Sequence, residues 1–403
     1  MGVTKIEKKK APTLRFPEFT EDWEERKSKE IFKAKVRKGE PNLPVLSVTQ
    51  TSGVVYRGEV GIDIKYDVST LKNYKVIEPN DFVISLRSFQ GGFELSDKLG
   101  ITSPAYTIFV PKYPEEQNNL FWRIQFKRFQ FIESLKTVTF GIRDGKSISF
   151  NEFGDLKIKF PSNILEQQKI GTFFKQLDDT IALHQRKLDL LKEQKKGYLQ
   201  KMFPKNGAKV PELRFAGFAD DWEERKSKEI FKAKVRKGEP NLPVLSVTQT
   251  SGVVYRGEVG IDIKYDVSTL KNYKVIEPND FVISLRSFQG GFELSDKLGI
   301  TSPAYTIFVP KYPEEQNNLF WRIQFKRFQF IESLKTVTFG IRDGKSISFN
   351  EFGDLKIKFP SNILEQQKIG TFFKQLDDTI ALHQRKLDLL KEQKKGFLQK
   401  MFV

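Results

Sequence analysis

Apolar residues form short runs in the first portion of the chain and recur at helical spacing in longer stretches. Turn-forming residues bound the short runs, whose β-branched and aromatic composition predicts strands. The runs are PVLSVTQ at 44–50, DFVISLR at 81–87, AYTIFV at 105–110 and the alternating LKIKF at 156–160. After Asn118, apolar residues at helical spacing predict one helix over 118–136. The pattern indicates an α+β globular region.

A long helix with coiled-coil periodicity is predicted after Pro161. Asn163 and Glu166 have the spacing of a capping box. Apolar residues then follow one another at alternating steps of four and three, which is typical of a coiled-coil seam. The seam is Ile170, Phe174, Leu177, Ile181, His184, Leu188 and Leu191, continuing through Lys195 and Tyr198 to Met202. At 1.5 Å per residue, a helix of about 40 residues spans roughly 60 Å.

Two polar residues, His184 and Lys195, interrupt this seam. A metal-binding or pH-sensing histidine is one interpretation. We favour the other, in which a polar seam residue fixes the register and the pairing of the helices.

The whole pattern occurs twice. Residues 23–197 recur without a change as residues 222–396, and the flanking segments match loosely. The second seam is Ile369, Phe373, Leu376, Ile380, His383, Leu387 and Leu390. A period near 200 residues is that of a whole domain rather than of a solenoid repeat. A perfect copy implies recent duplication or engineering, and the sequence leaves both open.

Two identical units in one chain can pack about a pseudo-two-fold axis, as in an isologous homodimer. Because each long helix needs an apolar partner of equal length, we expect the two helices to pair antiparallel, with a globular domain at each end. The expected domains are a basic N-terminal tail (1–20), a first globular domain (21–161), the first long helix (162–204), a linker (205–219), a second globular domain (220–360) and the second long helix (361–403).

Composition and charge narrow the function. The 403 residues carry a formal net charge of +17, which favours nucleic acid as the partner, with a membrane surface second. The chain has no cysteine and two histidines, so we expect no disulfide and no zinc site. No apolar run approaches 18 residues and the basic start lacks a signal-peptide core, so we expect a cytoplasmic protein without a membrane partner.

The helical segment FPSNILEQQKIGTFFKQLDDTIALHQRKLDLLKEQKKGYLQKMF at 160–203, with its copy at 359–402, resembles the conserved helical region of Type I restriction–modification specificity subunits. The WEERK…IF entry at 23–32 and SLRSFQGGFE…GITSPAYTIF at 85–109 resemble their target-recognition domains. The resemblance covers nearly the whole chain.

The resemblance implies a non-catalytic subunit in which two target-recognition domains each bind one half of a bipartite site in double-stranded DNA. It further implies two modification subunits, which use S-adenosylmethionine to methylate adenine, and two restriction subunits, which use ATP and Mg²⁺, as optional further partners. Family members normally carry two different recognition domains. Here both are the same, which implies an interrupted palindrome as the target.

Candidate DNA contacts lie in three loops, at 33–40, 86–92 and 141–147. Arginine and lysine suit phosphates and guanine, and glutamine suits adenine. The candidates are Arg37, Lys38, Arg87, Ser88, Gln90, Arg143 and Lys146, with the copies Arg236, Lys237, Arg286, Ser287, Gln289, Arg342 and Lys345. For each, an ordinary solvated side chain is the alternative.

Two other functions compete with this interpretation. A free-standing basic scaffold that bridges DNA segments would also explain the charge. A metal-dependent nuclease would need a carboxylate cluster. Asp81, Glu94, Asp97 and Lys98 could form a nuclease-like set, but their spacing is poor.

Overall fold

The computed structural model describes residues 11–49, 52–59, 68–85, 92–138, 148–205, 207–248, 251–258, 267–284, 291–337 and 347–403. The chain forms two compact units. Unit 1 is Met1–Gln185 with Lys386–Val403, and unit 2 is Arg186–Arg385. The boundaries fall inside the two long helices, α5 (Ile164–Lys201) and α10 (Ile363–Lys400), so each unit contains residues of both sequence repeats.

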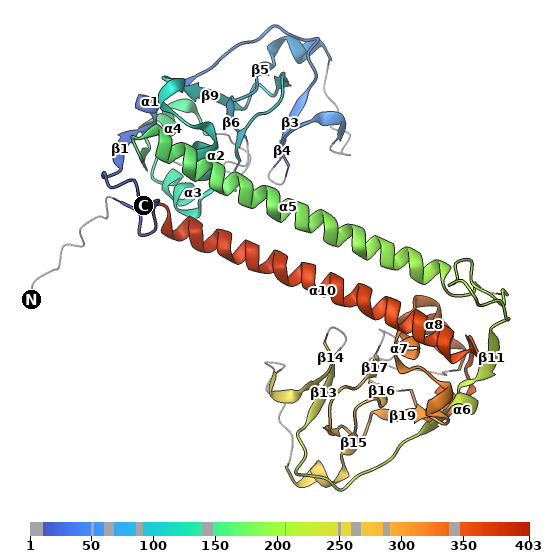
Figure 1. The fold of residues 1–403 in the computed structure, drawn as a ribbon. Coiled ribbons are helices and arrows are strands. Elements are labelled where there is room, and N and C mark those ends of the chain that lie inside the picture. The colour runs from blue at the N-terminus through green and yellow to red at the C-terminus, as the bar shows by residue number, and fades with distance from the viewer. Residues whose placement is uncertain are drawn as a thin grey trace, which may run out of the picture. The chain divides into compact units, whose positions relative to one another are not determined.

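The globular domain of unit 1 is built on an antiparallel four-stranded sheet with the order β2-β9-β6-β7. Figure 1 labels its two central strands, β9 and β6. Its strands are β2 (Phe32–Ala34), β9 (Thr107–Pro111), β6 (Phe82–Ile84) and β7 (Phe93–Leu95). Three antiparallel pairs among the described residues accompany it: β1 (Glu24–Lys27) with β10 (Lys157–Phe160), β3 (Leu46–Thr49) with β4 (Gly53–Tyr56), and β5 (Lys75–Ile77) with β8 (Gly100–Thr102). The short helices are α1 (Ser28–Ile31), α2 (Asn119–Lys127), α3 (Phe129–Leu135) and α4 (Phe150–Asp155), with 3₁₀ turns at Arg57–Glu59, Val68–Asn73 and Pro114–Glu116.

Unit 2 repeats this arrangement. Its four-stranded sheet has the order β12 (Phe231–Ala233), β19 (Thr306–Pro310), β16 (Phe281–Ile283) and β17 (Phe292–Leu294). The pairs are β11 (Glu223–Lys226) with β20 (Lys356–Phe359), β13 (Leu245–Thr248) with β14 (Gly252–Tyr255), and β15 (Lys274–Ile276) with β18 (Gly299–Thr301). The helices are α6 (Ser227–Ile230), α7 (Asn318–Lys326), α8 (Phe328–Ser333) and α9 (Phe349–Asp354), with 3₁₀ turns at Arg256–Glu258, Val267–Asn272, Pro313–Glu315 and Leu334–Thr336.

Aromatic rings fill the core of each globular domain. In unit 1 the ring of Phe32, from β2, lies 5.3 Å from that of Phe109 and 5.0 Å from that of Trp122, with edge-to-face geometry. All three side chains are fully buried. Burying a phenylalanine stabilises a fold by roughly 1.5–3 kcal/mol, so the phenylalanine-rich sequence is explained largely by this packing.

The helix predicted over 118–136 is wrong in one respect, because the structure divides it into α2 and α3. Asn118 is the N-cap as predicted, and its side chain accepts a hydrogen bond from Phe121 N at 3.0 Å. Arg128 interrupts the helix with an extended backbone (φ −71°, ψ 141°). The break lets α3 turn back, so that the Phe131 ring lies 5.0 Å from that of Phe126 in the core.

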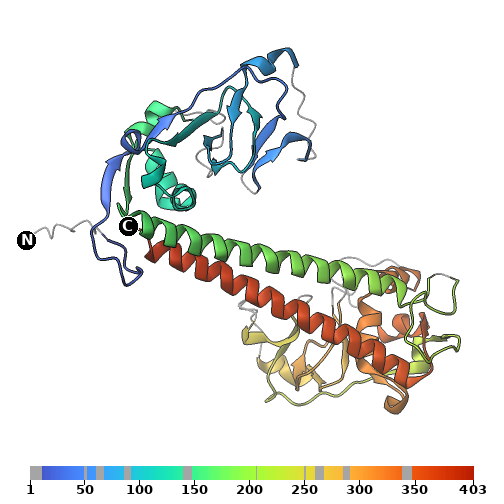
Figure 2. The same ribbon diagram turned by 45° about the horizontal axis from the view of Figure 1, so that its top comes forward.

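Helix α5 comprises 38 residues. Figure 2 shows it as one unbroken helix. The predicted capping box does not form. The side chain of Asn163 accepts from Leu165 N at 2.9 Å. The carboxylate of Glu166 instead accepts two hydrogen bonds of 2.7 Å from Arg15, and one of 3.3 Å from the indole of Trp23. Glu166 therefore ties α5 to the N-terminal segment rather than closing its own cap.

Within unit 1 the two long helices pack antiparallel. The Phe173 ring of α5 lies 5.0 Å from the Phe397 ring of α10, and Asp178 forms an ion pair of 2.5 Å with Lys394. Higher residue numbers on α5 thus meet lower ones on α10. Unit 2 shows the same arrangement, with Tyr198 against Phe372 and Lys195 paired with Asp377. The predicted fold class, α+β globular domains with long helices that pack together, is confirmed.

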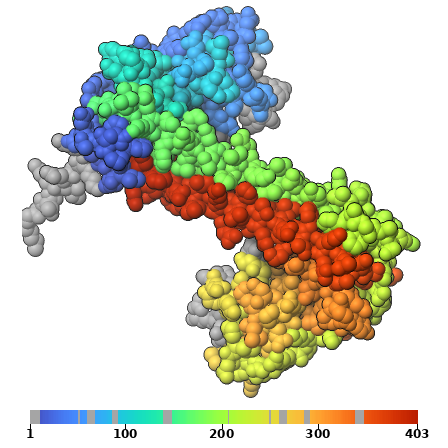
Figure 3. Space-filling view, in the orientation of Figure 1, coloured from blue at the N-terminus to red at the C-terminus, as the bar shows by residue number. Residues whose placement is uncertain are grey.

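The end of each helix completes the core of the globular domain that belongs to the other repeat. In unit 1, Phe402 is buried beside Trp23 and Phe121. Leu14 N donates to Lys400 O at 2.9 Å, and the space-filling view shows the N-terminal segment (dark blue) against this end of α10 (Figure 3). In unit 2 the equivalent residue, Phe203, is buried in the core of the second globular domain.

Candidate nucleic-acid interface

Of the predicted DNA contacts, Arg37, Lys38 and their copies Arg236 and Lys237 lie within the described residues. Both side chains of the first copy are exposed and follow β2. The other candidates lie outside the described residues, and their assignment stays a prediction. They are Arg87, Ser88, Gln90, Arg143, Lys146, Arg286, Ser287, Gln289, Arg342 and Lys345.

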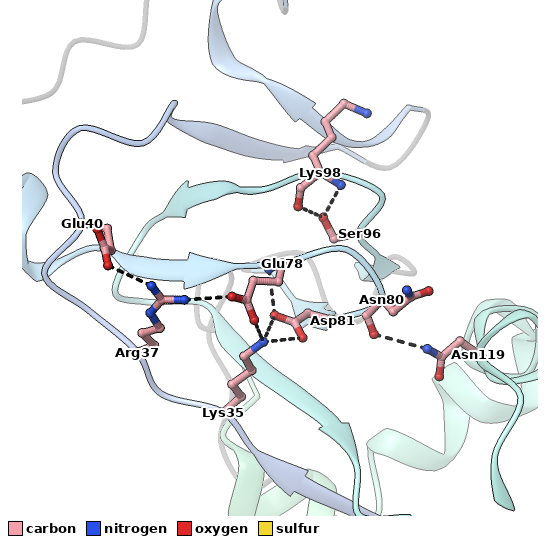
Figure 4. Close-up of polar contacts among 9 residues, drawn as sticks. All are labelled: Lys35, Arg37, Glu40, Glu78, Asn80, Asp81, Ser96, Lys98 and Asn119. Atoms are coloured by element: carbon pink, nitrogen blue, oxygen red, sulfur yellow. Dashed lines mark hydrogen bonds and ion pairs between the residues drawn. The ribbon is translucent and has the colours of Figure 1, made fainter. Parts of the chain in front are cut away.

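Arg37 is held by two carboxylates of its own domain. Its guanidinium donates to Glu78 and to Glu40, each at 2.8 Å (Figure 4). Lys35 donates to the other oxygen of Glu78 at 2.5 Å and to both oxygens of Asp81 at 2.8 Å. The five side chains form a chain of alternating charge that fixes the segment after β2 against the turn before β6.

The two carboxyl groups that Lys35 bridges respond oppositely to their surroundings. Burial raises the pKa of Asp81 above its ordinary value, although hydrogen bonds from Lys35 oppose the change. The hydrogen bond from Lys35 lowers the pKa of Glu78, which lies near the surface. Burial alone would lower the pKa of Lys35, but its hydrogen bonds to Asp81 and Glu78 outweigh this effect and raise it.

Lys38 differs from Arg37 in having no hydrogen bond or ion pair from its side chain among the described residues. Its main chain forms an isolated β-bridge with Lys75. Burial of Lys75 lowers the pKa of that residue, and the positive charge of Lys38 lowers it further. An exposed ammonium group without a carboxylate partner suits a phosphate contact. Arg37 would have to leave two carboxylates to make one.

Each carboxylate considered for a nuclease site is engaged by a lysine. Asp81 is bound by Lys35, Glu94 by Lys127 and Asp97 by Lys98. Asp81 and Lys98 lie apart in Figure 4. In the portion of the chain that the structure describes, no group of three carboxylate or histidine side chains could hold a metal ion.

The predicted seam residues are buried or half-buried along both long helices, and most intervening positions are exposed. Lys195, a polar member of the seam, donates to Asp377 at 2.5 Å within unit 2. His184 is half-buried. Asp178 is half-buried and pairs with Lys394.

Sequence reasoning missed the residues that join the helices to the globular domains. Arg15 binds Glu166 across 151 positions of sequence, and Arg214 binds Glu365 in the same bidentate way at 2.7 Å. Arg128 is 5% exposed, stacks over Phe402 at 4.5 Å, and lacks a carboxylate partner among the described residues. Burial lowers its pKa to about 10. No local sequence signal links residues so far apart.

In the part of the chain that the structure describes, every helix is too short or too polar to span a lipid bilayer.

Comparison with known proteins identifies the family. Residues 20–193 and 219–392 each match the Type I restriction modification DNA specificity domain. The MjaX type I restriction enzyme specificity subunit of Methanocaldococcus jannaschii is 24% identical over 270 residues, covering 62% of this chain. The match spans 60% of that relative's length.

A solved structure shares the fold. The S subunit of a Type I restriction–modification system from M. genitalium superposes with a TM-score of 0.61 at 16% identity, covering 98% of this chain and 99% of that one. The HsdS subunit from Thermoanaerobacter tengcongensis matches with a TM-score of 0.43 at 14% identity, covering 94% and 96%. From the match of both repeats to the family model, the chain belongs to the family of Type I restriction–modification DNA specificity subunits, which recognise DNA and do not carry the catalytic chemistry of these systems.

Proposed function

We propose that this chain recognises a bipartite, palindromic DNA target and directs adenine methylation there by two modification subunits. The observation that carries the proposal is the identity of the two repeats, residues 23–197 and 222–396, which contain nearly all of both recognition domains. Identical domains present identical side chains, so both half-sites have the same sequence. If the copies are related by a two-fold axis, the half-sites are inverted.

The internal contacts support treating the two domains as equivalent. The Arg37–Glu78 hydrogen bond of 2.8 Å recurs as Arg236–Glu277 at 2.8 Å. The Lys35–Asp81 pair recurs as Lys234–Asp280. Domains that repeat their internal contacts so closely are expected to bind the same bases.

The methylation and cleavage chemistry belongs to partners in this proposal. S-adenosylmethionine would be bound by the modification subunits, and ATP with Mg²⁺ by two restriction subunits that join for cleavage. This chain would contribute the DNA contacts and the paired long helices on which the modification subunits assemble.

Selection of bound sequences from a random DNA pool tests the proposal. The chain is assembled with its modification subunits, and bound duplexes are sequenced over several rounds. We expect two inverted copies of one half-site separated by a spacer of fixed length and free sequence. A single uninterrupted block, or two unrelated half-sites, would contradict it.

Paired substitutions separate base contacts from phosphate contacts. Arg87→Ala with Arg286→Ala should relax the sequence preference, each lost base contact costing about 1–3 kcal/mol. Lys38→Ala with Lys237→Ala should weaken all sequences alike and reduce the salt dependence of binding. Tight sequence-specific binding by the chain without any methyltransferase would favour the free-standing scaffold instead.

A further inference from the structure

Unit 2 contains a cleft of about 770 Å³ between its recognition domain and the long helices. One wall consists of the start of β14, the turn before β16, the edge strand β17 and helix α7. The opposite wall consists of Lys195 and Leu199 of α5 with Lys374 and Asp377 of α10. The volume lies within the range of roughly 300–1,000 Å³ that is typical of ligand sites.

Most lysines that line the cleft form ion pairs within unit 2. Lys326 pairs with the buried carboxylate of Glu293, and Lys195 pairs with Asp377. Lys297 pairs in the same way with Asp296 at 2.7 Å, and Lys374 pairs with Asp378. These four lysines therefore contribute little net charge to the cleft.

Arg322 is the exception among the described cationic residues of the lining. Its side chain is exposed on α7 and forms no hydrogen bond or ion pair with a described residue. Burial raises the pKa of Glu293, and Lys326 and Arg322 oppose that change. The guanidinium of Arg322 is thus close enough to act on the cleft electrostatically while its hydrogen-bond donors stay available.

Two neutral polar groups complete the lining near Arg322. Asn279 has a left-handed backbone (φ 72°), which few residues other than glycine adopt. Its main-chain oxygen accepts from Asn318, while its side-chain amide has no partner among the described residues. Ser251 adjoins Gly252, and its hydroxyl likewise has no described partner.

The other copy repeats these features within unit 1. Arg123 is exposed, and Lys127 pairs with the buried Glu94. Figure 4 shows Asn80, the counterpart of Asn279, accepting from Asn119 through its main-chain oxygen while no interaction is drawn at its side-chain amide. Asn80 has the same φ of 72°.

We propose that this cleft binds the sugar–phosphate backbone of DNA beside each half-site, with the Arg322 guanidinium, the Asn279 amide and the Ser251 hydroxyl as donors to phosphate oxygens. The equivalent donors of the other copy are Arg123, Asn80 and Ser52. Arginine, amide and hydroxyl groups are the side chains that commonly contact phosphates. The inference rests on the proposed function and adds a contact that carries no sequence information.

The test is the salt dependence of DNA binding by the full chain. Affinity for a random-sequence duplex of about 40 base pairs is measured by fluorescence anisotropy between about 20 and 200 mM salt. Each phosphate contact contributes about 0.9 to the slope of log affinity against log salt. Arg123→Ala with Arg322→Ala should reduce the slope by about 2 and weaken binding at every salt concentration.

Matched variants separate a local contact from a general loss of charge. Lys112→Ala with Lys311→Ala removes two exposed cations outside the cleft lining and should leave the slope within error of that of the unsubstituted chain. Asn80→Gly with Asn279→Gly keeps the left-handed backbone accessible. It should weaken binding several-fold without changing the slope, because the amide is neutral.

An unchanged slope in the double arginine variant would overturn the proposal, and so would absence of binding by the unsubstituted chain at about 20 mM salt. Because the duplex has random sequence, the result does not depend on whether the target is palindromic. If the selected target is palindromic but the double arginine variant has an unchanged slope, the cleft contact is refuted and the proposed function stands.

Discussion

Phe402→Ala tests the arrangement in which each long helix completes the core of the other repeat's recognition domain. The Phe402 side chain is 4% exposed, and its ring lies 5.9 Å from that of Trp23 and 5.7 Å from that of Phe121. Truncating a buried phenylalanine to alanine costs about 3–5 kcal/mol. The lost stacking of Arg128 over the ring adds about 0.5–2 kcal/mol. Unit 1 should lose stability, and unit 2 should not.

Hydrogen exchange followed by mass spectrometry locates the effect. Residues 23–197 and 222–396 are identical, so their peptides cannot be assigned to a copy, but segments 11–22 and 210–221 differ in sequence. A loss of about 3 kcal/mol corresponds to roughly 150-fold faster exchange through local opening. We expect this change in segment 11–22, where Leu14 N donates to Lys400 O. Loss of protection in segment 210–221 alone, or in neither segment, would refute the arrangement.

Three further predictions follow from single contacts. Gly171→Ala should destabilise unit 1, because a Cβ at this position would lie 2.7 Å from Phe121 N. A Cβ at Gly197 would have no atom within 4 Å, so Gly197→Ala should stabilise helix α5 by about 0.8–1 kcal/mol. Thermal denaturation of the two variants measures both effects. Glu166→Gln should cost about 3 kcal/mol in urea denaturation, since it leaves a largely buried Arg15 without its ion pair, and a change below about 1 kcal/mol would contradict the structure. The lowered pKa of Glu78 adds to the free energy of unfolding above the pKa of the unfolded state, and this contribution is lost as the pH falls. The raised pKa of Asp81 has the opposite effect on the free energy of unfolding. Between about pH 3 and 6, Glu78→Gln should therefore make stability fall less steeply with decreasing pH, and Asp81→Asn should make it fall more steeply.

The periodicity of the sequence predicted the elements that depend on local order. The heptad steps indicated the long helix, and Asn118 marked the start of α2 because both signals lie within one stretch of chain. The break at Arg128 was missed because tertiary packing of α3 overrides a helical pattern that continues through it. Glu166 was assigned to a helix cap because its actual partner, Arg15, is remote in sequence and gives no local signal.

Because the two repeats are identical, the sequence does not indicate which globular domain the end of each long helix packs against. Met202 and Phe203 could equally complete their own domain or the other one, because both present the same surface. Likewise, Arg37 was chosen as a DNA contact from its basic neighbours, and the carboxylate of Glu78 that binds it lies 41 residues away. Arg322 gave no signal in the sequence, since its availability depends on the ion pairs that engage the lysines around it.

The most direct test of the central claim, that two equal domains recognise two equal half-sites, is a base-pair scan of the selected target. Each position is substituted in one half-site and, in a separate duplex, at its mirror position in the other, and binding by the chain with its modification subunits is measured. The account predicts equal losses at mirrored positions, about 1–3 kcal/mol for each specified base pair. Losses confined to one half-site would contradict it.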